Sequence, residues 1–265
     1  MTQPTPITIQ AKGNRSLEAL LKRVNKDTEL NTYWKCANKI AMDRMRINDH
    51  GRVHVSIVAN IALRLHRLLQ ESGHEFSVAK DNEGYTVQDS EVVLFLAAAL
   101  HDVGHIVHRQ SHEEFSIALA KPLLERLLDG LYSGEKKYTL IAEVLHTIIG
   151  HSKVFRPLTT EASILRIADA LDMKKGRARI PFTLGSINIH AVSALAINDV
   201  VLRKGDAKKG EKPVIVEIVM DNPAGIFQVD SLLKEKMAGT GLEDAIGVKA
   251  EIRPGKAVQP LEFSF

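Results

Sequence analysis

Residues 91–112, EVVLFLAAALHDVGHIVHRQSH, join an apolar run to a cluster of side chains that can bind a metal ion. The nine apolar residues before His101 are too few to span a bilayer, and their alanine-rich end favours a helix buried on all sides. Gly104 is a suitable helix terminator, so His101 and Asp102 are expected in the last turn, at the edge of a core. A buried imidazole and carboxylate need a partner, and a divalent cation supplies one.

Further histidines and one aspartate predict a metal centre around this doublet. Six of the 11 histidines fall between residues 101 and 151. The candidate ligands lie at the ends or on the inner faces of separate predicted helices, and they are His54, His101, Asp102, His112, His146, His151 and Asp169. His146 precedes His151 by five residues, which a regular helix does not place on one face. A distortion at Gly150 would be needed to turn both side chains inward.

Three segments around these residues resemble the HD superfamily of metal-dependent phosphohydrolases: HVSIVA at 54–59, LHDVGH at 100–105 and ILRIADALD at 164–172. The similarity covers about residues 50–180. It implies that a first metal ion is held by His54, His101, Asp102 and Asp169, with Asp102 placed to bridge to a second ion. His112 and His151 lie where two-metal members carry additional ligands. The implied cofactor is a divalent transition metal, with two ions of iron, manganese, cobalt, nickel or zinc, because mixed nitrogen and oxygen ligands suit all of these.

The expected chemistry is hydrolysis of a phosphoester or phosphoanhydride in a nucleotide or another small phosphorylated metabolite. Two cations that share a water lower its pKa and offset charge on the phosphoryl oxygens, and Asp102 would hold both. The candidate substrate-binding residues are His50, Arg109, Lys153, Lys174 and Arg177. Arg109 directly follows the doublet segment and is the best placed of these for catalysis. His108 or Glu113 could protonate the leaving oxygen.

Three questions stay open from the residues alone. His105 belongs to an HDxGH string that carries a working histidine in nucleotide triphosphohydrolase relatives, but the proline and phenylalanine that follow it there are missing here. Some HD proteins use similar ligands to build a two-iron centre that activates oxygen, which is an alternative activity. A regulatory module that binds a nucleotide without hydrolysing it is a third reading, and the complete ligand set argues against it.

The composition is that of an ordinary globular protein. Hydrophobic residues make up 45% and charged residues 25% of the 265 residues, which excludes wholesale disorder and a fibrous chain. The net charge of +3 gives no strong case for DNA or RNA as a partner. The amino terminus lacks a basic region followed by an apolar core, and the single cysteine, Cys36, cannot form an intramolecular disulfide. We therefore expect a cytoplasmic protein that does not engage a membrane.

The periodicity of the sequence changes near residue 185, which predicts two domains. Residues 1–184 have the apolar spacing of helices and would form an all-helical HD domain. Residues 185–265 would form a small α+β domain, with a helix after Asn222-Pro223 and strands at 195–202, 214–220, 246–252 and 261–265. The expected fold class is mainly α. The role of the second domain is open, and a homodimer could form through it.

Overall fold

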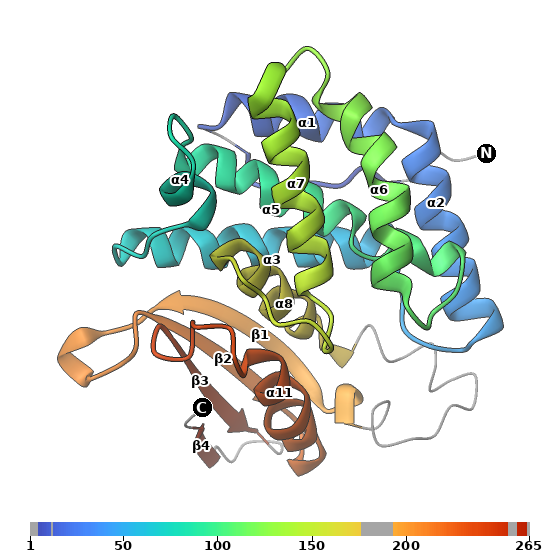
Figure 1. Ribbon diagram of the computed structural model, residues 1–265. Coiled ribbons are helices and arrows are strands. Elements are labelled where there is room, and N and C mark those ends of the chain that lie inside the picture. The colour runs from blue at the N-terminus through green and yellow to red at the C-terminus, as the bar shows by residue number, and fades with distance from the viewer. Residues whose placement is uncertain (1–4, 12, 176–192, 254–258, 264–265) are drawn as a thin grey trace.

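The computed structural model describes residues 5–11, 13–175, 193–253 and 259–263, which form a helical part and a small sheet (Figure 1). The principal helices are α1 (Arg15–Lys26), α2 (Thr28–Asn38), α3 (Arg52–Glu71), α4 (Ser77–Asp81), α5 (Val87–Leu100), α6 (His112–Leu128), α7 (Gly134–Gly150) and α8 (Thr160–Ala170). A π-helix, η1 (Lys39–Arg44), continues α2, and a 3-10 helix, η2 (Val103–Ile106), follows α5. The expected mainly helical fold is confirmed. None of the helices in the described ranges has the length and hydropathy that crossing a membrane demands.

Helix α5 is buried along nearly its whole length. Thr86 and Asp89 form a capping box at its start, in which each side chain accepts a hydrogen bond from the other residue's backbone N–H. Every residue from Asp89 to Leu100 is buried, so the predicted burial on all sides is confirmed. The helix contacts α3, α7 and α8, and the His101-Asp102 doublet that follows it therefore emerges inside the core.

The chain turns sharply after the doublet, and Gly104 makes this turn possible. A Cβ atom on Gly104 would lie 2.0 Å from the backbone oxygen of His112, so η2 packs directly against the first turn of α6. Ser116 of α6 fastens the two segments together. Its Oγ accepts a hydrogen bond from Gly104 N at 2.8 Å and donates to His101 O at 2.6 Å. The segments that carry His101 and His112 are thus held side by side.

The carboxy-terminal part is a four-stranded sheet with the strand order β1-β2-β3-β4. The strands β1 (Ile197–Lys204) and β2 (Val214–Met220) pair antiparallel as the predicted hairpin, with η3 (Ala207–Lys209) in its turn. Strand β2 pairs parallel with β3 (Ile246–Ile252), which pairs antiparallel with β4 (Gln259–Phe263). A parallel pair needs a crossover connection, and this one contains η4 (Pro223–Gly225), η5 (Gln228–Leu233) and α11 (Lys234–Met237). The predicted small α+β unit is confirmed.

The sheet and its crossover pack against α3 and α8 (Figure 1). Strand β1 contacts α3, and α11 contacts α8. The hydroxyl of Ser163 on α8 donates to the backbone oxygen of Thr240 at 2.8 Å. Apolar side chains of both parts belong to one hydrophobic core. The predicted domain boundary between residues 184 and 185 lies outside the described residues, and it stays a prediction.

Candidate metal centre

The carboxylate of Asp102 lies at the centre of a cluster of imidazoles. Its Oδ2 lies 3.2 Å from His54 Nε2 and 3.3 Å from His101 Nε2. Its Oδ1 lies 3.2 Å from His112 Nε2. The Oδ1 of Asp169 approaches the first pair, at 3.4 Å from His54 Nε2. The two oxygens of one carboxylate therefore face two different sets of nitrogen atoms.

The candidate donor atoms lie close enough to one another to coordinate a single metal ion. Within the described residues, three groups have their ligand atoms within 4.8 Å of one another: His54, His101 and Asp102; Asp102, His112 and His151; and His50, Asp102 and His105. Asp102 belongs to every one of them. This is the position that a bridging carboxylate needs.

Hydrogen bonds at Nδ1 turn the Nε2 atoms of the ligand histidines toward this centre. Three rings bond to backbone oxygens: His101 to Ala98 O at 2.9 Å, His112 to Arg109 O at 2.9 Å and His151 to Ile148 O at 2.5 Å. His54 bonds to Oδ2 of Asp172 at 2.7 Å. Because these oxygens can only accept, Nδ1 carries the proton and Nε2 keeps its lone pair for a metal ion.

The close approach of His54 Nε2 and His101 Nε2 fits a cation between them. These atoms lie 3.1 Å apart. In neutral rings protonated at Nδ1 neither nitrogen has a hydrogen to share, so the two lone pairs would repel each other. Two nitrogen ligands of one ion, each with a bond of about 2.0–2.1 Å, lie roughly 3.0–3.4 Å apart. The residues therefore fit a divalent transition metal.

The two aspartates of the cluster are held in the ionised form. Burial raises the pKa of Asp102, but positive charge on the neighbouring imidazoles, above all that of His101, outweighs burial and holds this pKa well below its usual range. A bound cation would supply the same positive charge when the rings are neutral ligands. Burial also raises the pKa of Asp169, and the ammonium group of Lys236 together with His54 lowers it well below its usual range. Metal ligation requires deprotonated carboxylates, and both aspartates meet that requirement.

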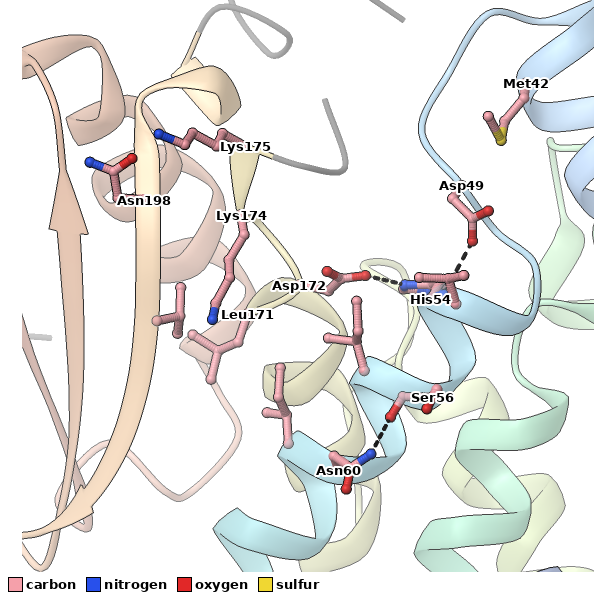
Figure 2. Close-up of a pocket in the computed structure, with 14 residues that line it drawn as sticks. Met42, Asp49, His54, Ser56, Asn60, Leu171, Asp172, Lys174, Lys175 and Asn198 are labelled. Atoms are coloured by element: carbon pink, nitrogen blue, oxygen red, sulfur yellow. Dashed lines mark hydrogen bonds and ion pairs between the residues drawn. The ribbon is translucent and has the colours of Figure 1, made fainter. Parts of the chain in front are cut away.

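Asp172 orients His54, although it was not among the predicted site residues (Figure 2). The backbone N–H of His54 also donates to Oδ1 of Asp49 at 3.1 Å, which fixes the first turn of α3. His54 and Asp172 form part of the wall of a cavity of about 800 Å³ between α3 and β1, which apolar side chains such as Ile57 also line. The position of Asp172, three residues after Asp169, was the one signal in the sequence that could have identified it.

Several other predicted residues lie around the ligands. Arg109 Nη1 donates to His50 Nε2 at 3.3 Å, and Arg109 is exposed. Oε2 of Glu113 lies 3.0 Å from His112 Nδ1, the place of an outer partner that orients the ring. His105 is buried with its Nε2 3.6 Å from Oδ1 of Asp102, and within the described residues neither of its ring nitrogens makes a hydrogen bond.

The structure places His146 and His108 outside this cluster. His146 Nε2 accepts a hydrogen bond from the backbone N–H of Leu158 at 3.2 Å. Because α7 runs as an α-helix to Gly150, the distortion that would have brought His146 to the same side as His151 is not there. His108 is exposed, and its Nδ1 accepts from the backbone of the same loop at 3.0 Å.

The predicted lysines have partners elsewhere. Lys153 forms an ion pair with Glu235, and Lys174 forms one with Asp199. All four of these side chains are largely exposed. Arg177 lies outside the described residues.

A lysine from the carboxy-terminal unit reaches the centre instead. Lys236 of α11 donates from Nζ to the backbone oxygen of His151 at 2.7 Å, and its Nζ lies 3.4 Å from Oδ2 of Asp169. Nothing in the local sequence around Lys236 indicates this contact, because it depends on how α11 packs against α8.

The helical fold and the cluster around Asp102 are those of an HD domain with a candidate metal centre. The HD domain model matches residues 52–174, so this part of the chain belongs to the HD domain family. The resemblance seen in the sequence is thereby confirmed. Over 233 residues the chain is 40% identical to the uncharacterized protein MJ1020 of Methanocaldococcus jannaschii, a match that covers 88% of each chain. No solved structure matches the chain.

Proposed function

We propose that this protein is a metal-dependent phosphohydrolase that cleaves a phosphoester or phosphoanhydride bond of a nucleotide or another small phosphorylated metabolite. The observation that carries the proposal is the division of the Asp102 carboxylate, with Oδ2 facing His54 and His101 and Oδ1 facing His112. A carboxylate so placed can bridge two divalent ions. One ion would be held by His54, His101, Asp102 and Asp169, and the other by Asp102, His112 and His151.

Two bound ions would lower the pKa of a shared water and offset negative charge on the phosphoryl oxygens. Hydrogen bonds within the protein hold the candidate ligands in position for these ions. The Nδ1 hydrogen bonds fix the imidazole rings, and Ser116 fastens the segment of His101 to that of His112. The side chains of His54 and His101 have no exposed surface, so solvent does not contact these two candidate ligands.

The substrate would approach where ligand side chains are exposed. His112, Glu113 and Asp169 each keep a fraction of their side-chain surface accessible. Arg109 and His50 lie next to each other at the edge of the site, and we assign them to binding the phosphate group. Glu113 contacts His112 directly, so its proposed role is to orient that ring.

The test is a substrate screen on protein purified without chelator and loaded with Mn²⁺ or Fe²⁺. Phosphomonoesters, phosphodiesters and nucleoside triphosphates are offered, and oxygen uptake is recorded in parallel. The proposal predicts product release that stops when the metal is removed and returns when it is restored. Oxygen consumption coupled to turnover would favour the two-iron oxygenase, and tight nucleotide binding without hydrolysis would favour the regulatory module. Either result rejects the proposal.

A further inference from the structure

Lys236 connects the carboxy-terminal unit to the metal centre. Its Nζ donates to His151 O at 2.7 Å and lies 3.4 Å from Asp169 Oδ2. His151 and Asp169 are candidate ligands with different neighbours: His151 groups with Asp102 and His112, whereas Asp169 Oδ1 lies 3.4 Å from His54 Nε2. Lys236, which follows Asp169 by 67 residues in the chain, therefore contacts one residue from each of the two proposed metal sites.

We infer that Lys236 binds a phosphoryl oxygen of the substrate, so that the carboxy-terminal unit completes the active site; this inference rests on the proposed function. The Oδ1 of Asp169 faces His54, and its Oδ2 faces Lys236. Lys236 therefore contacts the outer oxygen of a ligand whose inner oxygen points at the metal position. An ammonium group has three N–H donors, and His151 O and Asp169 Oδ2 account for two of them. The third can donate to an anion bound over the ions.

The side chain of Lys236 lies on the accessible side of the centre. Lys236 is 13% exposed and Asp169 is 21% exposed, whereas the His101 side chain is fully buried. An anionic group that approaches the centre from solvent on the side of Asp169 thus meets Lys236. A compact ammonium charge at this point suits a phosphate oxygen.

Neighbouring cations do not occupy this position. Lys153 pairs with Glu235, and Arg166 donates to the backbone oxygen of Phe155 at 3.3 Å. In the described part of the chain, Lys236 is the one lysine or arginine whose charged atom lies within 4.0 Å of the Asp102 or Asp169 carboxylate. This contact distinguishes Lys236 from the lysines that the sequence suggested.

The test uses the full chain loaded with Mn²⁺ and inorganic phosphate as the probe. Titration calorimetry measures phosphate binding, and elemental analysis measures bound manganese. Lys236→Met removes the charge at nearly the same side-chain length, and Lys236→Arg keeps the charge. Lys234→Met is the matched control, because Lys234 is also on α11 but is exposed and lies 3.8 Å from Asp230.

We expect phosphate affinity to fall by about tenfold or more in Lys236→Met, which is the size of effect that loss of a hydrogen bond between charged groups produces. Lys236→Arg should recover part of this loss, and Lys234→Met should bind as the wild type does. Manganese content should be unchanged in all three variants. With an active substrate, Lys236→Met should raise KM by a larger factor than it lowers kcat.

Phosphate affinity within twofold of wild type in Lys236→Met would overturn the inference. Loss of manganese from that variant would also overturn it, because Lys236 would then act by holding Asp169 and His151 in place. Circular dichroism checks the fold, and Lys236→Gln replaces the methionine variant if that variant is unfolded. If the wild type binds manganese and phosphate, Lys236→Met loses phosphate affinity, and no substrate is hydrolysed, then the proposed function fails while Lys236 is still shown to bind phosphate at this centre.

Discussion

The Nδ1–H of His54 donates to Oδ2 of Asp172 at 2.7 Å, and both side chains are buried. This bond determines which nitrogen of His54 faces Asp102, because a ring protonated at Nδ1 presents the lone pair of Nε2. Outer partners of this kind orient a metal ligand and raise its basicity. Asp172 therefore belongs to the candidate metal centre as a residue that orients a ligand and is not itself a ligand.

Asp172→Ala should weaken metal binding by about 10- to 100-fold, the effect typical of losing an outer partner of a ligand histidine. Asp172→Asn should lose less metal affinity than Asp172→Ala does, because the amide oxygen can still accept a hydrogen bond from His54 Nδ1. Titration of the metal-free protein with Mn²⁺ measures both affinities. Asp43→Ala, at an exposed position on η1, is the control and should bind as the wild type does. Equal affinities for Asp172→Ala and wild type would show that this hydrogen bond does not orient His54.

His112→Ala should remove one of two bound ions and leave the other. His112 contacts Oδ1 of Asp102, whereas His54 and His101 contact Oδ2. Metal analysis should therefore show a fall from about two ions per chain to about one. His146→Ala, at a position that bonds to Leu158 instead, should keep the wild-type content. Loss of both ions from His112→Ala, or of neither, would contradict this division of the ligands.

Local patterns were sufficient to predict most of the helices and strands. The apolar run before His101 identified the buried helix α5, and runs of valine and isoleucine identified the hairpin of β1 and β2. Both patterns depend on residues that are close in the sequence. How the sheet packs on α3 and α8 depends on contacts between distant segments, and the sequence carried no sign of it.

The candidate site was predictable to the extent that it follows the HD pattern. His54, the doublet and Asp169 lie together as the resemblance implied. His146 did not, because its spacing from His151 is incompatible with a shared face on a regular helix. Lys236 could not be predicted, since its contact with Asp169 is made only when α11 packs against α8.

Gly104→Ala should destabilise the protein more than Gly130→Ala does. A Cβ at Gly104 would lie 2.0 Å from the backbone oxygen of His112, and relieving this clash requires α6 to move, at a typical cost of about 1–3 kcal/mol or more. At Gly130 nothing lies within 4 Å, and only the φ of +67° disfavours alanine, by about 1–2 kcal/mol. Urea unfolding compares the two variants. A smaller loss in Gly104→Ala would show that η2 and α6 are not tightly packed.

The buried His66 should make the protein less stable in acid. Burial lowers the pKa of His66 to about 4, from 6.5 for an unperturbed histidine. The unfolded chain then binds a proton that the folded protein does not. The stability that depends on neutral His66 is complete above pH 6.5 and falls by up to about 3 kcal/mol as the pH approaches 4. Chemical unfolding at pH 7 and at pH 4 should show a smaller loss in His66→Gln than in wild type.

Glu161 affects the pH dependence of stability in the direction opposite to His66. The contribution of His66 is therefore read from the difference between wild type and His66→Gln. Burial raises the pKa of Glu161, whose carboxylate accepts a hydrogen bond from Ser90 Oγ at 2.6 Å. The folded protein therefore holds this proton more tightly than the unfolded chain does, and the effect favours the folded state as the pH falls. This effect of Glu161 is present in both wild type and His66→Gln, so it does not change the difference between them. Equal losses in wild type and His66→Gln would show that His66 does not titrate in this range.

The proposed role of Asp102 as a ligand shared by two ions is tested most directly by comparing metal content and phosphate release in Asp102→Asn and in the wild type. An amide in place of the carboxylate removes the charge that both halves of the ligand set share. We expect about two ions per wild-type chain. The variant should keep its helical circular dichroism spectrum, lose both ions, and hydrolyse substrate at least about 100-fold more slowly. A variant that retained its ions and hydrolysed phosphorylated substrates at the wild-type rate would show that the Asp102 carboxylate does not hold the ions.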